Sequence, residues 1–263
     1  MKRLVLWIIP VLIWGTGCAD DKEIAHGISG SLTWTLSSDG TLLISGKGEI
    51  CDYQVAPTEN LPTWFGYRND ILKVIIGDEV SRIGNFAIYR CENLTSVSIG
   101  NSVSSIGIRA FSGCSSLVSV NIPASLTIIE DETFSGCKSL SPVNIPNLVT
   151  AIGNAGFYKC ESLTSIIIPN SVLTIGKNAF WGCNGLTHIT IGNSVTTIGD
   201  DAFRECSGLK EIINYHITPQ EINKAMFNGL TTNKCTLFVP SGSENFYRAA
   251  DGWKNFTNIK AIQ

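Results

Sequence analysis

The sequence has few charged residues and no excess of positive charge. Of its 263 residues, 16% are charged, and the 19 basic and 22 acidic residues leave a net charge of -3. A disordered chain combines low hydrophobicity with high net charge, whereas this chain is 44% hydrophobic. Non-specific nucleic-acid binding needs a broad basic face. The composition therefore excludes a disordered chain, gives no support to a nucleic-acid partner, and provides enough apolar side chains for a large core.

Residues that commonly carry catalysis or bind metals are scarce or unsuitably spaced. The sequence has 3 histidines, none of them in an HExxH motif, and it has no GxSxG nucleophile motif. No two of its 9 cysteines lie closer than 23 residues, whereas zinc sites usually use cysteines about two to four residues apart. Neighbouring carboxylates such as Asp200 and Asp201 precede a predicted helical turn, where acidic residues are favourable. The sequence therefore predicts no catalytic residue, no metal site and no cofactor.

The N-terminus has the pattern of an export signal. Lys2 and Arg3 precede an apolar run from Leu4 to Trp14, and the small residues 15–17 follow, which is the order of a secretory signal peptide. The run is shorter than the roughly 20 apolar residues that span a bilayer. We therefore expect residues 1–17 to be a signal peptide.

Residues 15–18 resemble a bacterial lipobox, in which the cysteine becomes the lipidated N-terminus of the mature chain. Gly15 stands where a lipobox usually has leucine or a similar residue. The resemblance implies that Cys18 is lipidated, that residues 18–23 form a tether, and that the protein reaches the outer membrane or the cell surface. Contact with a membrane would then occur through the lipid anchor only. Ordinary cleavage, giving a periplasmic or secreted protein, is the alternative.

An internal repeat of 23 residues determines the predicted fold. Isoleucine, cysteine and leucine each recur at this spacing without an insertion. The repeated positions begin at Ile76, Ile83, Cys91 and Leu94. Six such units fill residues 76–213.

Each unit has a strand-like half and a half rich in turns. In one unit, Leu117, Val120 and Ile122 form an LxxVxI pattern, which is typical of the strand of a leucine-rich repeat. Proline or glycine ends the strand, and the Ala, Phe and Cys within residues 110–114 suit a short helical turn that faces inward. An asparagine follows the strand in several units, and we expect these amides to bond to the backbone of neighbouring coils. These positions are Asn101, Asn147, Asn170 and Asn193.

A single coil cannot fold by itself, because the apolar area that it buries does not offset the backbone entropy that it loses. Stacked coils share their cores, so the units predict a solenoid whose inward cysteines are free thiols. The open ends need caps. We expect residues 24–75 to form an N-terminal β meander. Residues 214–263 are expected to form a degenerate seventh coil and a β/α cap, closed by Trp253 and Phe256, and the protein is expected to be a monomer.

These features resemble the BspA-like leucine-rich repeats, a bacterial class with a 23-residue IPxSVxxIGxxAFxxCxxLxxV unit. The likeness covers nearly all of the mature chain, including LTWTLSSDGTLLISGKGE at 32–49 and CTLFVP at 235–240. Two local departures are Glu130, in place of glycine, and Pro142, within a predicted strand. The resemblance implies a β-rich leucine-rich repeat solenoid with short helical turns and a parallel concave sheet. It also implies a cell-surface protein linked to adhesion and host-protein binding.

The concave sheet is the expected binding surface, because solenoids bind through such extended faces. Side chains that point outward from the predicted strands are mostly small, uncharged and polar. Toward one end, larger and charged side chains interrupt this pattern, and we predict that this end binds the ligand. The predicted patch comprises Ser165, Ile167, His188, Thr190, Glu211 and Ile213. A plain ladder of serine and threonine that only solvates the sheet is the alternative.

A second candidate surface lies on the opposite wall, where Tyr89, Tyr158 and Trp181 share one position of the repeat. Exposed aromatic side chains often anchor interfaces, but packing against neighbouring coils explains them equally well. The sequence thus predicts a non-enzymatic, adhesin-like surface protein that binds a protein or glycan partner. A structural or assembly component of the cell envelope is the alternative.

Overall fold

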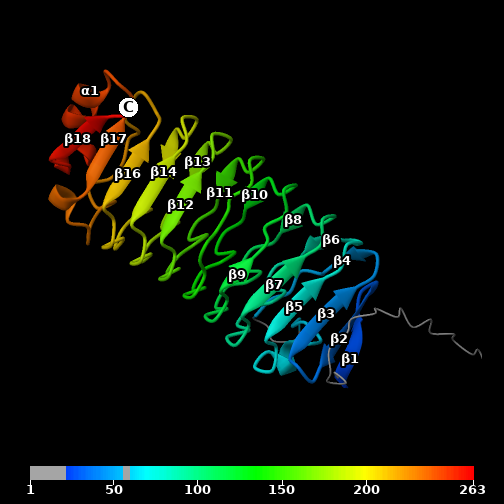
Figure 1. Ribbon diagram of the computed structural model, residues 1–263. Coiled ribbons are helices and arrows are strands. Elements are labelled where there is room, and N and C mark those ends of the chain that lie inside the picture. Colours follow the sequence, from blue (N-terminus) through cyan, green and yellow to red (C-terminus); the bar gives the residue numbers. More distant parts are fainter. Residues whose placement is uncertain (1–21, 56–59) are drawn as a thin grey trace, which may run out of the picture.

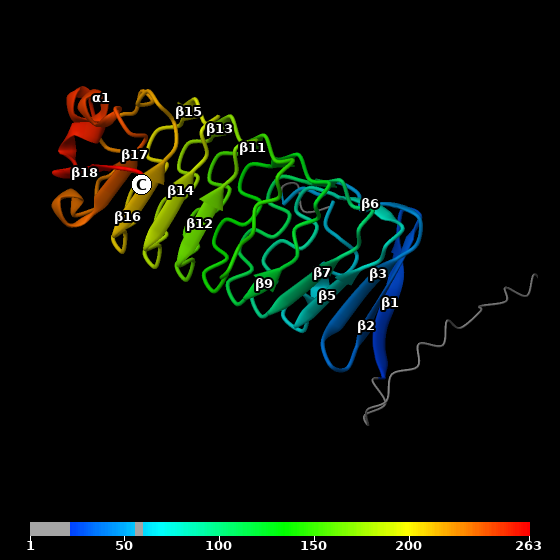
Figure 2. The same ribbon diagram turned by 45° about the horizontal axis from the view of Figure 1, so that its top comes forward.

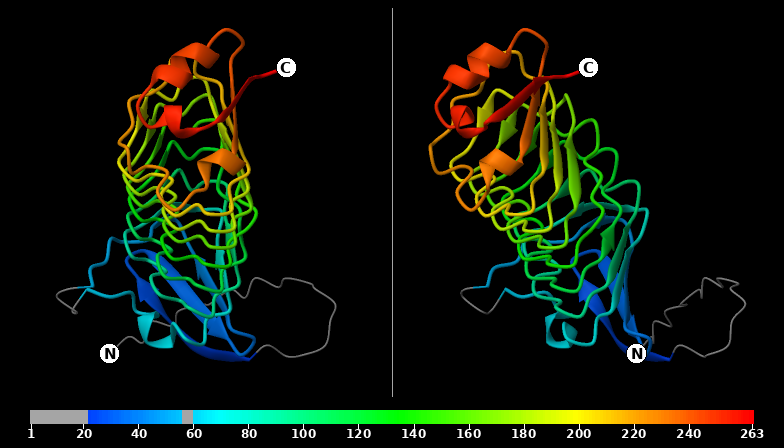
Figure 3. Two further views of the ribbon diagram at one scale, coloured as in Figure 1. Left: turned by 90° about the vertical axis from the view of Figure 1, so that its left-hand side faces the viewer. Right: turned by 60° about the vertical axis from the view of Figure 1, so that its left-hand side comes forward.

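The computed structural model describes residues 22–55 and 60–263, which wind into a solenoid of stacked coils (Figure 1). The solenoid has a blue N-terminal meander at one end and a red C-terminal cap at the other, and Figure 3 shows the coils stacked between them. The predicted signal peptide and Cys18 lie outside the described residues. Within the described part, no helix has the length and apolar character needed to cross a membrane.

The longer strands lie on one side of the solenoid, which we call the broad face (Figure 2). Its N-terminal sheet contains β1 (Glu23–Ser29), β2 (Leu32–Ser37), β3 (Thr41–Ser45), β5 (Lys73–Ile76), β7 (Ser96–Ile99) and β9 (Ser119–Val120), in that order. Its C-terminal sheet contains β12 (Ser165–Ile168), β14 (His188–Ile191), β16 (Glu211–Asn214), β17 (Thr236–Val239) and β18 (Asn258–Ala261). Successive coils pair in parallel and in register, as the constant period requires.

Shorter strands form two further sheets on another side of the coils. The first sheet contains β4 (Gly48–Glu49), β6 (Val80–Ile83) and β8 (Ser105–Ile106). The second contains β10 (Ile128–Ile129), β11 (Ala151–Ile152), β13 (Thr174–Ile175) and β15 (Thr197–Ile198). The repeated second isoleucine of each unit ends its strand and is buried.

The two ends of the solenoid are covered by caps of different kinds. At the N-terminus, β1, β2 and β3 form an antiparallel meander, and β3 then pairs in parallel with β5. The indole N–H of Trp64, just before the 3-10 helix Phe65–Tyr67, donates to the carbonyl of Ala87 at 2.9 Å and so fastens this cap to the first coil. The C-terminal cap contains α1 (Glu244–Ala249) and the 3-10 helices Thr232–Lys234 and Trp253–Asn255.

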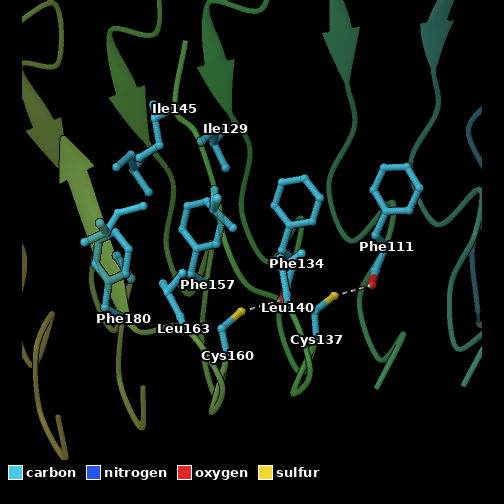
Figure 4. Close-up of a cluster of buried hydrophobic side chains, with 14 of the residues drawn as sticks. Phe111, Ile129, Phe134, Cys137, Leu140, Ile145, Phe157, Cys160, Leu163 and Phe180 are labelled. Carbon is cyan, nitrogen blue, oxygen red and sulfur yellow. Dashed lines mark hydrogen bonds between the residues drawn. The ribbon is translucent and has the colours of Figure 1, made fainter. Parts of the chain in front are cut away.

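A continuous apolar core runs along the axis of the solenoid, as the repeat predicted. The phenylalanines from Phe111 to Phe203 stack with ring centroids 5.4 to 5.6 Å apart. Figure 4 shows this stack from Phe111 to Phe180. The repeated isoleucines, leucines and strand valines surround this stack and are buried, except that Val120 and Ile122 are partly exposed. Each layer of the core is therefore closed by the layers on either side.

The repeated cysteines are free and buried, which confirms the predicted ladder of thiols. Each thiol from Cys114 to Cys206 donates to a backbone carbonyl of the preceding coil, such as Cys137 to Phe111 at 3.2 Å (Figure 4). Cysteine suits this position because its side chain is small and apolar and because its thiol, a weak donor, can bond to the backbone carbonyl of the preceding coil.

In the native protein, we expect a thiol reagent to modify Cys51 and to spare the seven other described cysteines, since Cys51 alone among them is exposed. Burial raises the pKa of Cys91 and of Cys183 to about 12, so the reactive thiolate is scarce at neutral pH. Peptide mass spectrometry after brief alkylation measures each site, with alkylation in denaturant as the control. Rapid native labelling of Cys137 would contradict the buried ladder.

The predicted helical turn of each repeat is present only as isolated turns, and residues 76–213 contain no regular helix. Two residues in each turn, such as Arg109 and Gly113, have positive φ angles near 55° and 79°, so a helix cannot continue through them. Backbone N–H groups of the turn instead bond to the next coil, as Phe111 does to the carbonyl of Thr133 at 3.0 Å.

The strand ladders are interrupted where the sequence departs from its repeat. Pro142 has no N–H to donate, and residues 142–145 form no strand, which separates β9 from β12. Glu130 replaces a glycine whose equivalents, such as Gly153, lie so close to the preceding coil that a Cβ would be 2.6 Å from its backbone. The Glu130 side chain therefore explains the break between β8 and β10. The predicted sheet is thus divided into two parts.

Candidate functional site

The C-terminal sheet brings all six residues of the predicted patch together in two rows. The first row consists of Ser165, His188 and Glu211 on β12, β14 and β16. The second row consists of Ile167, Thr190 and Ile213. Because adjacent strands are about 4.8 Å apart, each row is a continuous line of side chains on the broad face.

Pairing of β16 with β17 and β18 extends both rows by residues that the sequence analysis did not select. Thr236 continues the first row, while Phe238 and Lys260 continue the second. Phe238 follows Ile213 by 25 residues rather than 23, so the repeat spacing did not predict that Phe238 lies in this row. The burial of its neighbours Leu237 and Val239 is the alternation that could have identified it.

The second row is the more apolar of the two. Ile167 is 67% exposed, whereas Ile213 and Phe238 are half-buried. Glu211, Ile213 and Phe238 also line a shallow pocket of about 210 Å³ with the C-terminal residues 262–263. In the first row, the exposed His188 places Nδ1 2.8 Å from the Thr187 hydroxyl oxygen, within hydrogen-bond distance.

A larger pocket lies where β12, β14 and β16 end, next to Ile167 and Thr190. Its volume is about 490 Å³. Its lining residues are Asn147, Ile167, Ile168, Pro169, Asn170, Ser171, Thr190, Gly192 and Tyr215. The sequence analysis missed Tyr215. Its signal was a tyrosine at the position where the other coils have proline or glycine after the strand.

Backbone register places Pro169, Gly192 and Tyr215 on successive coils. The N–H of Gly192 donates to Ile168 at 3.0 Å, and the N–H of Tyr215 donates to Ile191 at the same distance. Tyr215 thus adds an aromatic ring, 42% exposed, beside the small residues Pro169 and Gly192 of the preceding coils. A Cβ at Gly192 would lie 2.6 Å from the Pro169 carbonyl oxygen, so a side chain cannot occupy the space between Pro169 and Tyr215 without a shift of the backbone.

The predicted aromatic patch is only partly brought together. Tyr158 and Trp181 contact edge to face with centroids 5.9 Å apart, and the Arg204 guanidinium lies 4.6 Å from the Trp181 ring. Tyr89 is separated from them by two coils with serine at that position, and it packs on Phe86 instead. All three predicted aromatics are half-buried, and these contacts account for them as packing between coils.

The titratable groups of the described residues are scattered or buried. Residues 22–55 and 60–263 contain no group of three or more His, Cys, Asp or Glu side chains suited to a metal ion. Burial raises the pKa of the inward thiols, such as that of Cys114, and these groups lie in the closed core, away from any substrate. The C-terminal sheet combines the two rows with a pocket of about 490 Å³ at its strand ends.

The stacked parallel strands, the 23-residue period and the single apolar core define a leucine-rich repeat solenoid. The chain belongs to the BspA type leucine-rich repeat family, whose model matches it in six copies over residues 62–186 and 129–260. This match confirms the family that the repeat unit resembled.

Solved structures of leucine-rich repeat proteins are similar to this chain. The T. pallidum leucine-rich repeat protein is 23% identical over 70% of this chain and 90% of its own, with a TM-score of 0.50. A Bacteroides ovatus leucine-rich repeat protein is 20% identical over 90% of this chain and 76% of its own, with a TM-score of 0.45. A leucine-rich cell surface protein from Faecalibacterium prausnitzii is 21% identical over 93% and 96%, with a TM-score of 0.40. No curated protein matches in sequence. At these identities the likeness concerns the fold alone.

Proposed function

We propose that this protein is an exported, adhesin-like surface protein that binds a protein or glycan partner through the C-terminal sheet, without catalysis. The second row carries the proposal. In this row the Ile167 side chain is 67% exposed, and Ile213 and Phe238 lie further along the same row. Thr190 lies between Ile167 and Ile213, and Phe238 is next to Ile213, so the row presents apolar side chains on three of four neighbouring strands. Exposed apolar side chains grouped on one face are typical of interaction sites.

The family and the N-terminal sequence support the other parts of this proposal. Leucine-rich repeat proteins of this type are typically non-enzymatic surface or exported proteins. The apolar run after Lys2 and Arg3 is consistent with export. Lipidation of Cys18 would then hold the solenoid on the membrane, with its broad face free for a partner.

A structural or assembly role in the envelope is the second candidate. It is favoured by β1, an edge strand on which Ile24 and Ile28 are 52% and 68% exposed. An exposed apolar edge is a template for pairing with another chain. This role would use the end of the solenoid rather than the C-terminal sheet.

Binding by intact cells tests the first candidate. We expect cells that display the protein to capture at least one member of a panel of purified extracellular matrix proteins. Ile167→Asp should reduce this capture about tenfold or more, because a desolvated charge replaces an apolar contact and each tenfold change costs about 1.4 kcal/mol.

The matched control is Ile75→Asp, because Ile75 lies at the same repeat position four coils earlier and is 41% exposed. This control should capture normally. Equal losses in both variants would refute binding through the C-terminal sheet, and no capture by the unmodified protein would refute a matrix-protein partner. Circular dichroism establishes that both variants are folded.

A further inference from the structure

The pocket at the ends of β12, β14 and β16 differs from the rest of the broad face in shape and in chemistry. At about 490 Å³ it falls in the range of small-ligand sites. Ile167 and Thr190 of the second row line this pocket, whereas no residue of the first row does. A concave site of this size selects a compact ligand or a terminal group of a larger one.

The lining residues restrict the charge of that ligand. None of the nine is charged, so a phosphate, sulfate or carboxylate group would lose its hydration without an ionic partner. The polar lining groups are side-chain amides and hydroxyls, which both donate and accept hydrogen bonds. They suit a neutral ligand with many hydroxyl groups.

Apolar surface is present beside these polar groups. Tyr215 and Ile167 are 42% and 67% exposed, and both line the pocket. An aromatic ring offers a flat apolar surface with a polar hydroxyl at its tip. A pyranose ring combines an apolar C–H face with a rim of hydroxyls, so Tyr215 and the neighbouring amides complement both parts of it.

One of the two lining amides, that of Asn170, is held in place before any ligand arrives. Asn170 Oδ1 accepts the backbone N–H of Asn193 at 3.0 Å, which confirms one step of the predicted asparagine ladder. This bond leaves the Asn170 amide nitrogen free to donate. Asn147, which also lines the pocket, has a free amide nitrogen too, because its side chain makes no hydrogen bond to protein within the described residues. A fixed donor such as the Asn170 amide reduces the entropy cost of binding.

We propose that this pocket binds a neutral saccharide, with Tyr215 as the stacking residue and Asn147 and Asn170 as hydrogen-bonding residues. This inference rests on the proposed binding function and specifies the class of its ligand. A partner glycoprotein would be recognised through an uncharged sugar at the end of a glycan chain.

The test is binding of the purified protein to an array of neutral, sialylated and sulfated oligosaccharides, followed by saturation-transfer NMR on those that bind. We expect binding of neutral members, with saturation transferred to ring C–H protons. Tyr215→Ala should weaken binding about tenfold or more, whereas Tyr215→Phe, which keeps the ring, should retain most of it. Tyr67→Ala, at a similarly exposed tyrosine of the N-terminal cap (39%), is the matched control and should leave binding unchanged.

The outcomes separate this inference from the proposed function. Preference for the acidic oligosaccharides, or equal effects of Tyr215→Ala and Tyr67→Ala in folded protein, would overturn the saccharide site. Capture of a deglycosylated matrix protein that still depends on Ile167 would also overturn it, while leaving the proposed function intact. Absence of both saccharide binding and matrix-protein capture would refute both.

Discussion

Phe157→Ala is expected to lower the free energy of unfolding by about 3–5 kcal/mol, the usual cost of removing a buried phenylalanine. The Phe157 ring is 0% exposed and stacks between Phe134 and Phe180 at centroid distances of 5.5 and 5.4 Å. Its removal leaves a cavity in the centre of the solenoid, where neighbouring coils are held by their own ladders and cannot collapse to fill it.

Chemical denaturation followed by circular dichroism measures this loss. Phe246→Ala is the matched control, because Phe246 lies on α1 and is 57% exposed. We expect this control to change the free energy of unfolding by about 0.5 kcal/mol or less. Equal effects of the two substitutions would mean that the phenylalanine stack is not the core that stabilises the coils.

Trp253→Ala is expected to have a similarly large effect, confined to the C-terminal end. Trp253 is 0% exposed, and its ring contacts Phe227 and Tyr247 at centroid distances of 5.5 and 5.4 Å. Its indole N–H donates to the Gln220 carbonyl at 2.9 Å. Loss of the ring costs about 3–5 kcal/mol, and the unpaired carbonyl adds about 1 kcal/mol.

Hydrogen exchange distinguishes local from global loss. In a solenoid each coil contacts only its neighbours, so amide protection should fall in β17 and β18 and persist in β5 and β7. Trp253→Phe, which keeps an aromatic ring but removes the indole donor, should show a smaller effect. Uniform loss of protection along the chain, or none, would contradict the role of Trp253 as the closing residue of the cap.

Much of the fold is predictable because each coil repeats one environment. A cysteine or leucine that recurs every 23 residues occupies the same place in every layer. Residues that are 23 positions apart in the sequence are therefore neighbours on adjacent coils. The buried position of Phe157 and the in-register pairing of His188 with Glu211 follow from this alone. The same reasoning placed the patch residues of the first and second rows side by side.

The departures from the repeat were visible in the sequence, but their consequences were not. Glu130 and Pro142 are single substitutions, and only the close approach of the coils shows that the first interrupts one ladder and the second divides the broad face. The isolated turns likewise depend on left-handed residues such as Arg109, which sequence patterns do not reveal.

The sequence by itself determined the class of fold, the apolar spine and the face that the patch residues share, because a constant period converts sequence position directly into position in space. Only the tertiary structure decided where Phe238 lies and that Tyr215 lines a pocket. Phe238 follows a change of register, and the pocket joins Asn147 to Tyr215, which lie on different coils. Such a site is made by side chains from several coils together, and no single repeat unit encodes it.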